Sequence, residues 1–156
     1  MTSRQSSASF VPSPARILVA GTREAVRTIR RIAGSEAEII AAYSTDEALR
    51  RLDARVDLIV CNVRFDESRM FDFLEAALSR LPGIPIVCCR VSITELGEGV
   101  RHAIEMALDA IGVDTFVDCA PLYRDKGEAG AAEALRRAIL SSAAGGSRSD
   151  SRGRAV

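Results

Sequence analysis

Asn62 is the polar residue whose position in the sequence most strongly suggests a functional site. It follows a run of β-forming residues, 56–61, and precedes a polar loop and a helical pattern of apolar residues that begins at Met70. This order is typical of a buried strand in an open α/β sheet, where sites form at the carboxyl ends of the strands. The amide of Asn62 can both donate and accept hydrogen bonds at such an edge.

Four cysteines are the next candidates for chemistry. Cys61, Cys88, Cys89 and Cys119 all lie in apolar runs, and none has C-x-x-C spacing. This placement predicts buried, reduced thiols in a cytoplasmic protein. The alternative is a thiol-based redox sensor, because three of the runs end near one sheet edge and adjacent strands lie about 4.8 Å apart, within disulfide range.

The other titratable residues offer little that suggests catalysis. His102 is the only histidine, and no nucleophile pattern accompanies it. Asp66 and Glu67 follow Asn62 in the loop and are predicted to be solvated acids near a helix N-terminus rather than metal ligands. We therefore expect no enzyme activity and no metal.

Composition narrows the class of protein further. The chain has 156 residues, is 47% hydrophobic and carries no net charge. These values suit one domain with a substantial core, and they give no overall basic field for nucleic acid or an anionic membrane. Neither a signal-peptide pattern nor an apolar run of roughly 20 residues is present, so no membrane span is expected.

Strand and helix patterns alternate along the chain. Residues 1–14 are predicted to be a disordered arm, 15–142 the folded domain, and 143–156 a flexible tail. The predicted strands are 16–20, 37–43, 56–62, 84–89 and 115–119, and the predicted helices are 23–33, 44–52, 69–81, 98–111 and 128–142. Five βα units with right-handed crossovers make a parallel sheet with helices on both faces.

With five units of these lengths, residues 15–142 resemble the response-regulator receiver domain. The best local match is 56–62, which is similar to the receiver strand that ends in the phospho-acceptor Asp. The resemblance implies a flavodoxin-like, doubly wound fold with strand order 2-1-3-4-5. The positions that match the receiver's acidic pair, acceptor, hydroxyl residue and Lys are, in that order, Gly21 with Thr22 (or Ala20 with Gly21), Asn62, Arg90 (or Cys89) and Cys119 (or Ala120).

Every chemical position of the receiver site has therefore changed. A hard divalent cation prefers carboxylate oxygens, and an amide is not a nucleophile toward a phosphoryl group as a carboxylate is. We expect a pseudo-receiver that needs no cofactor, is not phosphorylated and acts in signalling through protein–protein interaction, with Arg90 lying across the vacated cavity and bonding Asn62 or loop carbonyls. The alternative is a module whose Arg90, Thr22 and loop N–H groups bind a small anion or a nucleotide phosphate.

The resemblance also implies where a partner would bind. In receivers the fourth helix, fifth strand and fifth helix commonly form the face that meets partners or makes homodimers. The matching candidates are His102, Phe116, Glu133, Arg136 and Arg137. The segment 91–100 lengthens this region by roughly two helical turns relative to a typical receiver, so a remodelled output face is expected.

Overall fold

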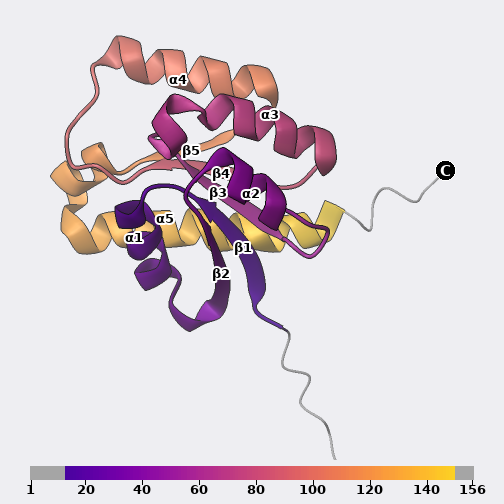
Figure 1. The fold of residues 1–156 in the computed structure, drawn as a ribbon. Helices are drawn as coiled ribbons and strands as arrows, with labels where there is room; N and C mark the ends of the chain where they lie inside the picture. Colours follow the sequence, from indigo (N-terminus) through magenta and orange to yellow (C-terminus); the bar gives the residue numbers. More distant parts are fainter. Residues whose placement is uncertain (1–12, 150–156) are drawn as a thin grey trace, which may run out of the picture.

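A computed structural model describes residues 13–149. Its five strands form one parallel sheet in the order β2-β1-β3-β4-β5, which confirms the flavodoxin-like prediction (Figure 1). The strands are β1 (Ala15–Ala20), β2 (Ala37–Ala42), β3 (Leu58–Asn62), β4 (Ile86–Arg90) and β5 (Thr115–Asp118). The helices are α1 (Arg23–Ala33), α2 (Thr45–Arg51), α3 (Met70–Arg80), α4 (Glu98–Ile111) and α5 (Cys119–Ser149), with short 3-10 turns η1 (Gly34–Glu36) and η2 (Phe65–Ser68).

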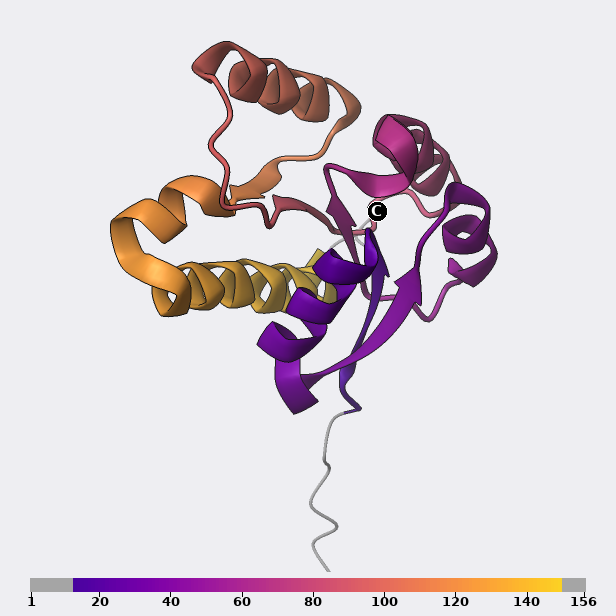
Figure 2. The same ribbon diagram turned by 60° about the vertical axis from the view of Figure 1, so that its left-hand side comes forward.

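The helices form two layers around the sheet because strand side chains alternate between its faces. On one face, Leu18 and Ile59 pack with α2, α3 and α4, and Phe65 meets Phe73 edge-on at 5.4 Å between ring centroids. On the other face, Ile17 and Val60 pack with α1 and α5 (Figures 1 and 2). Both faces of β3 are therefore buried, and the strand delivers Asn62 to the carboxyl edge of the sheet.

Hydrogen bonds from side chains fix where the first two helices begin. The hydroxyl of Thr22 accepts from the N–H of Ala25 at 3.2 Å, and that of Ser44 accepts from the N–H of Glu47 at 3.2 Å. Such N-caps satisfy backbone donors that have no partner within the helix. The chain thus turns into a helix immediately after β1 and soon after β2.

The largest differences from the predicted boundaries lie in the last helix and the tail. The last helix starts at Cys119 with a break at Gly127, where φ is 73°, and it continues to Ser149. Ala143, predicted to lie in the tail, is buried against the sheet face that carries α5. The remaining tail residues, 150–156, and residues 1–12 of the predicted arm lie outside the described residues.

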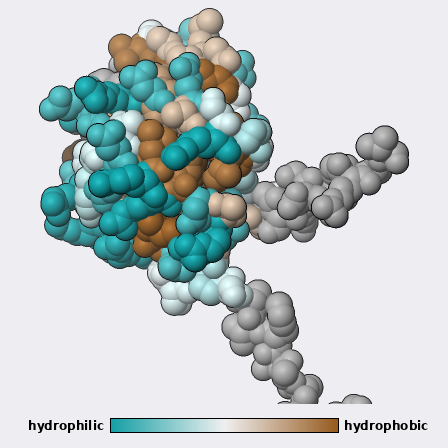
Figure 3. All heavy atoms as spheres, turned by 45° about the vertical axis from the view of Figure 1, so that its right-hand side comes forward, coloured by the Kyte–Doolittle hydropathy of each residue, from teal (hydrophilic) through white to brown (hydrophobic). Residues whose placement is uncertain are grey.

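Charged side chains cover much of the molecular surface, with apolar atoms showing between them (Figure 3). Within residues 13–149, no helix combines the length and the hydropathy needed to cross a bilayer.

Candidate functional site

Gly21 and Asn62 lie side by side at the carboxyl edge of the sheet, as predicted. A Cβ atom placed on Gly21 would lie 3.2 Å from the Cβ of Asn62 and 3.3 Å from that of Ala25. Both distances are shorter than ordinary van der Waals contact, so any side chain at position 21 would push its neighbours apart. The absence of a carboxylate here is therefore built into the packing.

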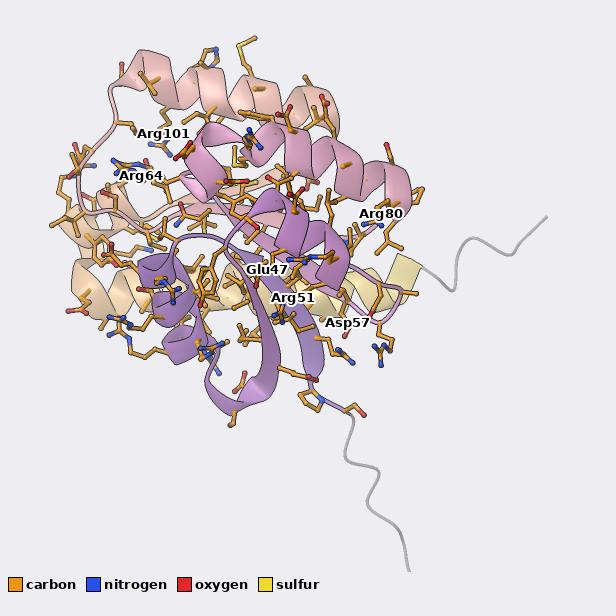
Figure 4. The ribbon with its side chains drawn as sticks, in the orientation of Figure 1. Glu47, Arg51, Asp57, Arg64, Arg80 and Arg101 are labelled. Carbon is orange, nitrogen blue, oxygen red and sulfur yellow. The ribbon has the colours of Figure 1, made fainter. Side chains whose placement is uncertain are left out.

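The amide of Asn62 is occupied within its own loop. Its Oδ1 accepts a hydrogen bond from the N–H of Arg64 at 2.9 Å, and only 3% of the residue is exposed. This short-range bond stabilises the turn that leaves β3. Arg64 itself is exposed at the surface (Figure 4), and the interior of the edge is filled by Asn62.

Arg90 pairs with Asp118, which corrects the prediction that Arg90 bonds Asn62 or loop carbonyls. The two residues are register partners at the ends of β4 and β5. The Nη1 of Arg90 lies 3.3 Å from the Oδ1 of Asp118, and only 4% and 1% of the two side chains are exposed. The same Oδ1 accepts from the N–H of Ala120 at 3.2 Å, so the carboxylate is both neutralised and bound to the start of α5.

Asp118 is the functional residue that sequence reasoning missed. The signal for it was present: an acid close to the end of the fifth predicted strand, in a run otherwise apolar. A buried charge needs a partner, and Arg90 was the nearest candidate at the end of a neighbouring strand.

Thr22 and Cys119 do not join the Arg90–Asp118 pair through polar bonds. Thr22 is the N-cap of α1 and its hydroxyl is used there. Cys119 is the first residue of α5 and is buried on the sheet face that carries α1 and α5. Of the five predicted positions, Gly21 and Asn62 are in contact, Arg90 is paired with Asp118, and the other two are structural.

The cysteines are all buried and free. Cys61 and Cys88 are register partners on one face, whereas Cys89 and Cys119 lie on the other. Burial raises the pKa of Cys119 to about 11 and that of Cys88 to about 12, and it also raises the pKa values of Cys61 and Cys89. The thiols are therefore protonated near neutral pH. No cluster of three or more His, Cys, Asp or Glu side chains suited to a metal occurs within residues 13–149.

Asp66 is not the solvated loop acid that was predicted. Its Oδ2 accepts from the N–H and the hydroxyl of Thr45, at 2.8 and 2.7 Å, at the start of α2. These bonds lower the pKa of the Asp66 carboxyl. Asp66 and Glu67 adopt left-handed backbone conformations, with φ of 45° and 51°, which is unfavourable for residues other than Gly. The carboxylate that follows Asn62 is thus committed to holding α2.

Comparison with solved structures finds response-regulator receiver domains. One from Methanospirillum hungatei has a TM-score of 0.64 at 15% identity, over 88% of this chain and 99% of its own. The signal receiver domain of an HD domain-containing protein from Pseudomonas fluorescens scores 0.63 at 13% identity, over 86% and 98%. The chemotaxis response regulator CheY4 of Vibrio cholerae scores 0.57 at 18% identity, over 81% and 100%.

This chain has the receiver fold. No protein-family model matches the sequence, and no curated protein matches it significantly. At these identities the likeness establishes the fold alone. The chemistry at the carboxyl edge of the sheet depends on this chain's own residues.

The five predicted partner-face residues do not form one surface on this receiver fold. His102 is exposed on α4, while Phe116 on β5 is partly buried against the core beneath that helix. On α5, Glu133 pairs with Arg136 and Arg137, and Arg136 also reaches Glu36 of η1, on the side of α1. These α5 charges therefore pair with one another and with η1, and no ion pair joins them to α4 within the described residues.

A different apolar surface lies on α4 and the loop before it. Ile93 is 75% exposed, Met106 60% and Val100 54%. Of the residues of α4, only Leu108 is buried. The helical spacing of Val100, Ile104 and Leu108 predicts that all three face inward, and for Val100 this prediction is wrong. Apolar atoms at the top of Figure 3 lie at the level of α4. The helix therefore presents more apolar surface than the domain covers.

Proposed function

We propose that this protein is a receiver-like signalling module that acts by contacting another protein, without being phosphorylated and without enzyme activity. The observation that carries the proposal is the buried pair of Arg90 and Asp118 at the edge where receivers carry out phosphoryl transfer. The buried acid at that edge is neutralised, and the acceptor position holds an amide.

The chemistry of the edge argues against phosphoryl transfer for three reasons. Asn62 lacks a nucleophilic carboxylate. Gly21 has no side chain, and packing against Asn62 and Ala25 leaves no easy room for one. The carboxylate of Asp118 is held by a guanidinium and a backbone N–H, so it cannot serve a hard cation without breaking that pair.

The buried pair also favours a single state of the domain. Removing one partner from a buried ion pair typically costs about 3–5 kcal/mol because the other charge is left without compensation. A switch that separated Arg90 from Asp118 while the carboxylate stayed buried would have to supply a free energy of that size. We therefore infer that the module signals by its presence and its surface rather than by a change of state.

The surface that we assign to partner binding is α4 with the preceding loop. Ile93, Val100 and Met106 are exposed, and they give an apolar surface that a single chain leaves uncovered. The occupant is another protein or a second copy of the chain. Zero net charge makes nucleic acid or an anionic membrane a poor partner. We also propose that the protein works in the cytoplasm.

The phosphorylation part of the proposal is tested with acetyl phosphate and Mg²⁺, using intact mass to detect an added phosphoryl group. We expect no addition to the wild type or to Asn62→Asp, because that variant still has Gly21 and the Arg90–Asp118 pair. A phosphorylatable receiver in the same buffer is the control. An acid-stable, base-labile adduct on the wild-type protein would reject the proposal.

The partner-binding part is tested by comparing two variants in pull-downs from the native cytosol. Val100→Glu/Met106→Glu is expected to lose the proteins that the wild type retains. Arg137→Glu, an equally exposed position on α5, is expected to retain them. Equal retention by both variants would move the partner surface away from α4.

The anion-binding alternative makes a separate prediction. Inorganic phosphate or a nucleotide would have to compete with Asp118 for Arg90, so we expect no thermal stabilisation at millimolar ligand. A shift of several degrees that disappears in Arg90→Met/Asp118→Leu would favour the alternative instead.

A further inference from the structure

The edge strand β2 carries unpaired backbone groups along a line of arginines. Because Ala42 accepts from the N–H of Gly21, the residue after β1, the strand alternation turns the N–H and C=O groups of Ile39 and Ala41 to the outside of the sheet. No hydrogen bond outside the sheet ladders involves the backbone of either residue within the described chain. β2 is one of the two edges of the sheet (Figure 1), and edges of this kind can accept a further strand.

Helix α1 lines one side of this edge with positive charge. Arg23, Arg27 and Arg30 are exposed and follow i, i+4, i+7 spacing, so they share one face of the helix. The guanidinium of Arg23 lies over the ring of Tyr43, which follows β2, at 4.9 Å from the ring centroid. Arg30 lines a groove together with Ile39, Ile40 and Ala41. Arg23 therefore lies at the end of β2, beside Tyr43, and Arg30 lies beside the middle of the strand.

The charged residues that line the groove itself are equal in number but are divided unevenly between its two sides: Arg16, Arg30 and Arg51 with Glu38, Glu47 and Asp53. On the α2 side Arg51 pairs with Glu47 at 3.3 Å, and both are seen on that helix in Figure 4. At the start of β1, Arg16 lies 3.8 Å from Glu38. Within the described chain, Arg23, Arg27 and Arg30 have no carboxylate within ion-pair distance. The α1 wall of the groove is thus open to an anionic partner.

We propose that β2 binds an extended acidic segment of another protein, which adds a sixth strand to the sheet. Backbone bonds to Ile39 and Ala41 would hold the segment, as in other cases of strand addition. Alternate side chains of a strand face the same side at about 7 Å intervals, and Arg23 to Arg30 spans about 10 Å along the helix. Asp or Glu at two or three alternating positions would therefore meet the three arginines.

Other occupants fit these charges less well. A second copy pairing antiparallel through β2 would bring the two α1 arginine lines face to face. The chain's own ends carry no alternating acids: residues 1–12 have Arg4 as their only charged side chain, and 150–156 hold one Asp with two Arg. Nucleic acid offers no alternating N–H and C=O groups to the strand edge. The proposed surface is separate from α4 and from the Arg90–Asp118 pair, so it stands or falls apart from the proposed function.

The test measures binding of a fluorescein-labelled peptide, Thr-Glu-Val-Glu-Val-Glu-Val-Thr, by fluorescence anisotropy at low salt. We expect binding that weakens about tenfold in Arg27→Glu/Arg30→Glu and stays within about twofold in Arg101→Glu/Arg137→Glu, which reverses two exposed charges on α4 and α5. A peptide methylated on alternate backbone nitrogens keeps its charges but loses the donors for β2, and it is expected to bind at least about tenfold more weakly.

Four results would overturn the proposal. The first is a dissociation constant weaker than about 1 mM for the unmodified peptide. The second is equal binding of the methylated peptide, which would mean attraction by charge alone. The third is tighter binding of an oligo-dT of equal charge, which would point to nucleic acid. The fourth is a dimer in sedimentation that disappears in Ala41→Pro, a change that removes an outward N–H and leaves the β1 ladder intact; this would assign the edge to a second copy. Matching circular dichroism of all variants is the folding control.

Discussion

The carboxyl edge of the sheet and helix α4 differ in whether their notable side chains have partners inside the molecule. At the edge, polar side chains find partners inside the molecule: Asn62 bonds the N–H of Arg64, and Arg90 pairs with Asp118. On α4, Val100 and Met106 are exposed although both are large and apolar. The edge that is reactive in receivers is filled here by paired polar groups. Helix α4, in contrast, exposes apolar side chains of a kind that a monomer normally buries.

This contrast underlies the proposed function. A satisfied polar network makes a domain rigid and specifies one arrangement, while exposed apolar surface is costly unless something covers it. In our proposal the edge serves stability and α4 serves contact. The predictions below test whether the two regions separate in this way.

The largest effect is expected from Arg90→Leu. The substitution leaves the Asp118 carboxylate buried without its guanidinium, and we expect a loss of about 3–5 kcal/mol in the free energy of unfolding. Urea unfolding followed by circular dichroism measures it. Arg90→Met/Asp118→Leu, which removes both charges, should recover most of the loss. If Arg90→Leu cost no more than the exposed change Arg101→Leu, the edge would not be a closed, interdependent site.

A second comparison is made within α4 itself. Leu108→Ala removes a buried side chain and is expected to cost about 3 kcal/mol, whereas Met106→Ala, two residues earlier, should change stability by less than about 0.5 kcal/mol. Thermal or urea unfolding measures both. Similar losses would mean that Met106 packs in solution, and the open face of α4 would then not exist.

A smaller effect is expected where the loop after Asn62 holds α2. Asp66→Ala removes two hydrogen bonds to Thr45, and we expect a loss of about 1 kcal/mol at pH 7, similar to that of a helix cap. Because these bonds lower the pKa of Asp66 in the folded state, its contribution is complete above the unfolded pKa and is lost as the pH falls through the folded value.

The pH dependence checks this assignment directly. Wild type and Asp66→Ala should differ in stability at neutral pH and converge below about pH 4. Asp66→Asn, which keeps an acceptor without the charge, should lie between them at pH 7. A difference that persists unchanged to pH 2 would show that the loss comes from the left-handed backbone and not from the carboxylate.

The sequence predicted which residues lie at the carboxyl edge of the sheet better than it predicted which of them pair with one another. Gly21, Asn62 and Arg90 could be placed at the edge because each lies at or just after the end of a strand, and strand ends are visible as breaks in β-forming runs. Asp118 was missed because a shift of one residue at a strand end moves every side chain to the other face. The Arg90–Asp118 pair spans 28 positions, and no local pattern specifies it.

The misassigned residues share a physical cause. The spacing of Val100, Ile104 and Leu108 is helical, but periodicity gives no information about how much of a helix face the sheet covers, and Val100 is 54% exposed. Asp66 reaches Thr45 across 21 positions through two left-handed residues that are not Gly, so turn chemistry gave no warning. Local patterns establish the elements; the charges and contacts between elements decide the site.

The smallest effect is expected from reagents that attack thiols. They test whether the four cysteines are as inaccessible as the polar groups at the carboxyl edge. With a pKa of about 11 for Cys119, only about one part in a thousand is thiolate at pH 8, and the other three are also held protonated by burial. The native protein should therefore show no fast phase with Ellman's reagent, while all four thiols react in denaturant. Diamide should leave the thermal midpoint unchanged. One thiol that reacts as fast as free cysteine would reopen the redox alternative, because such a rate requires an accessible sulfur that the packing around β3, β4 and α5 excludes.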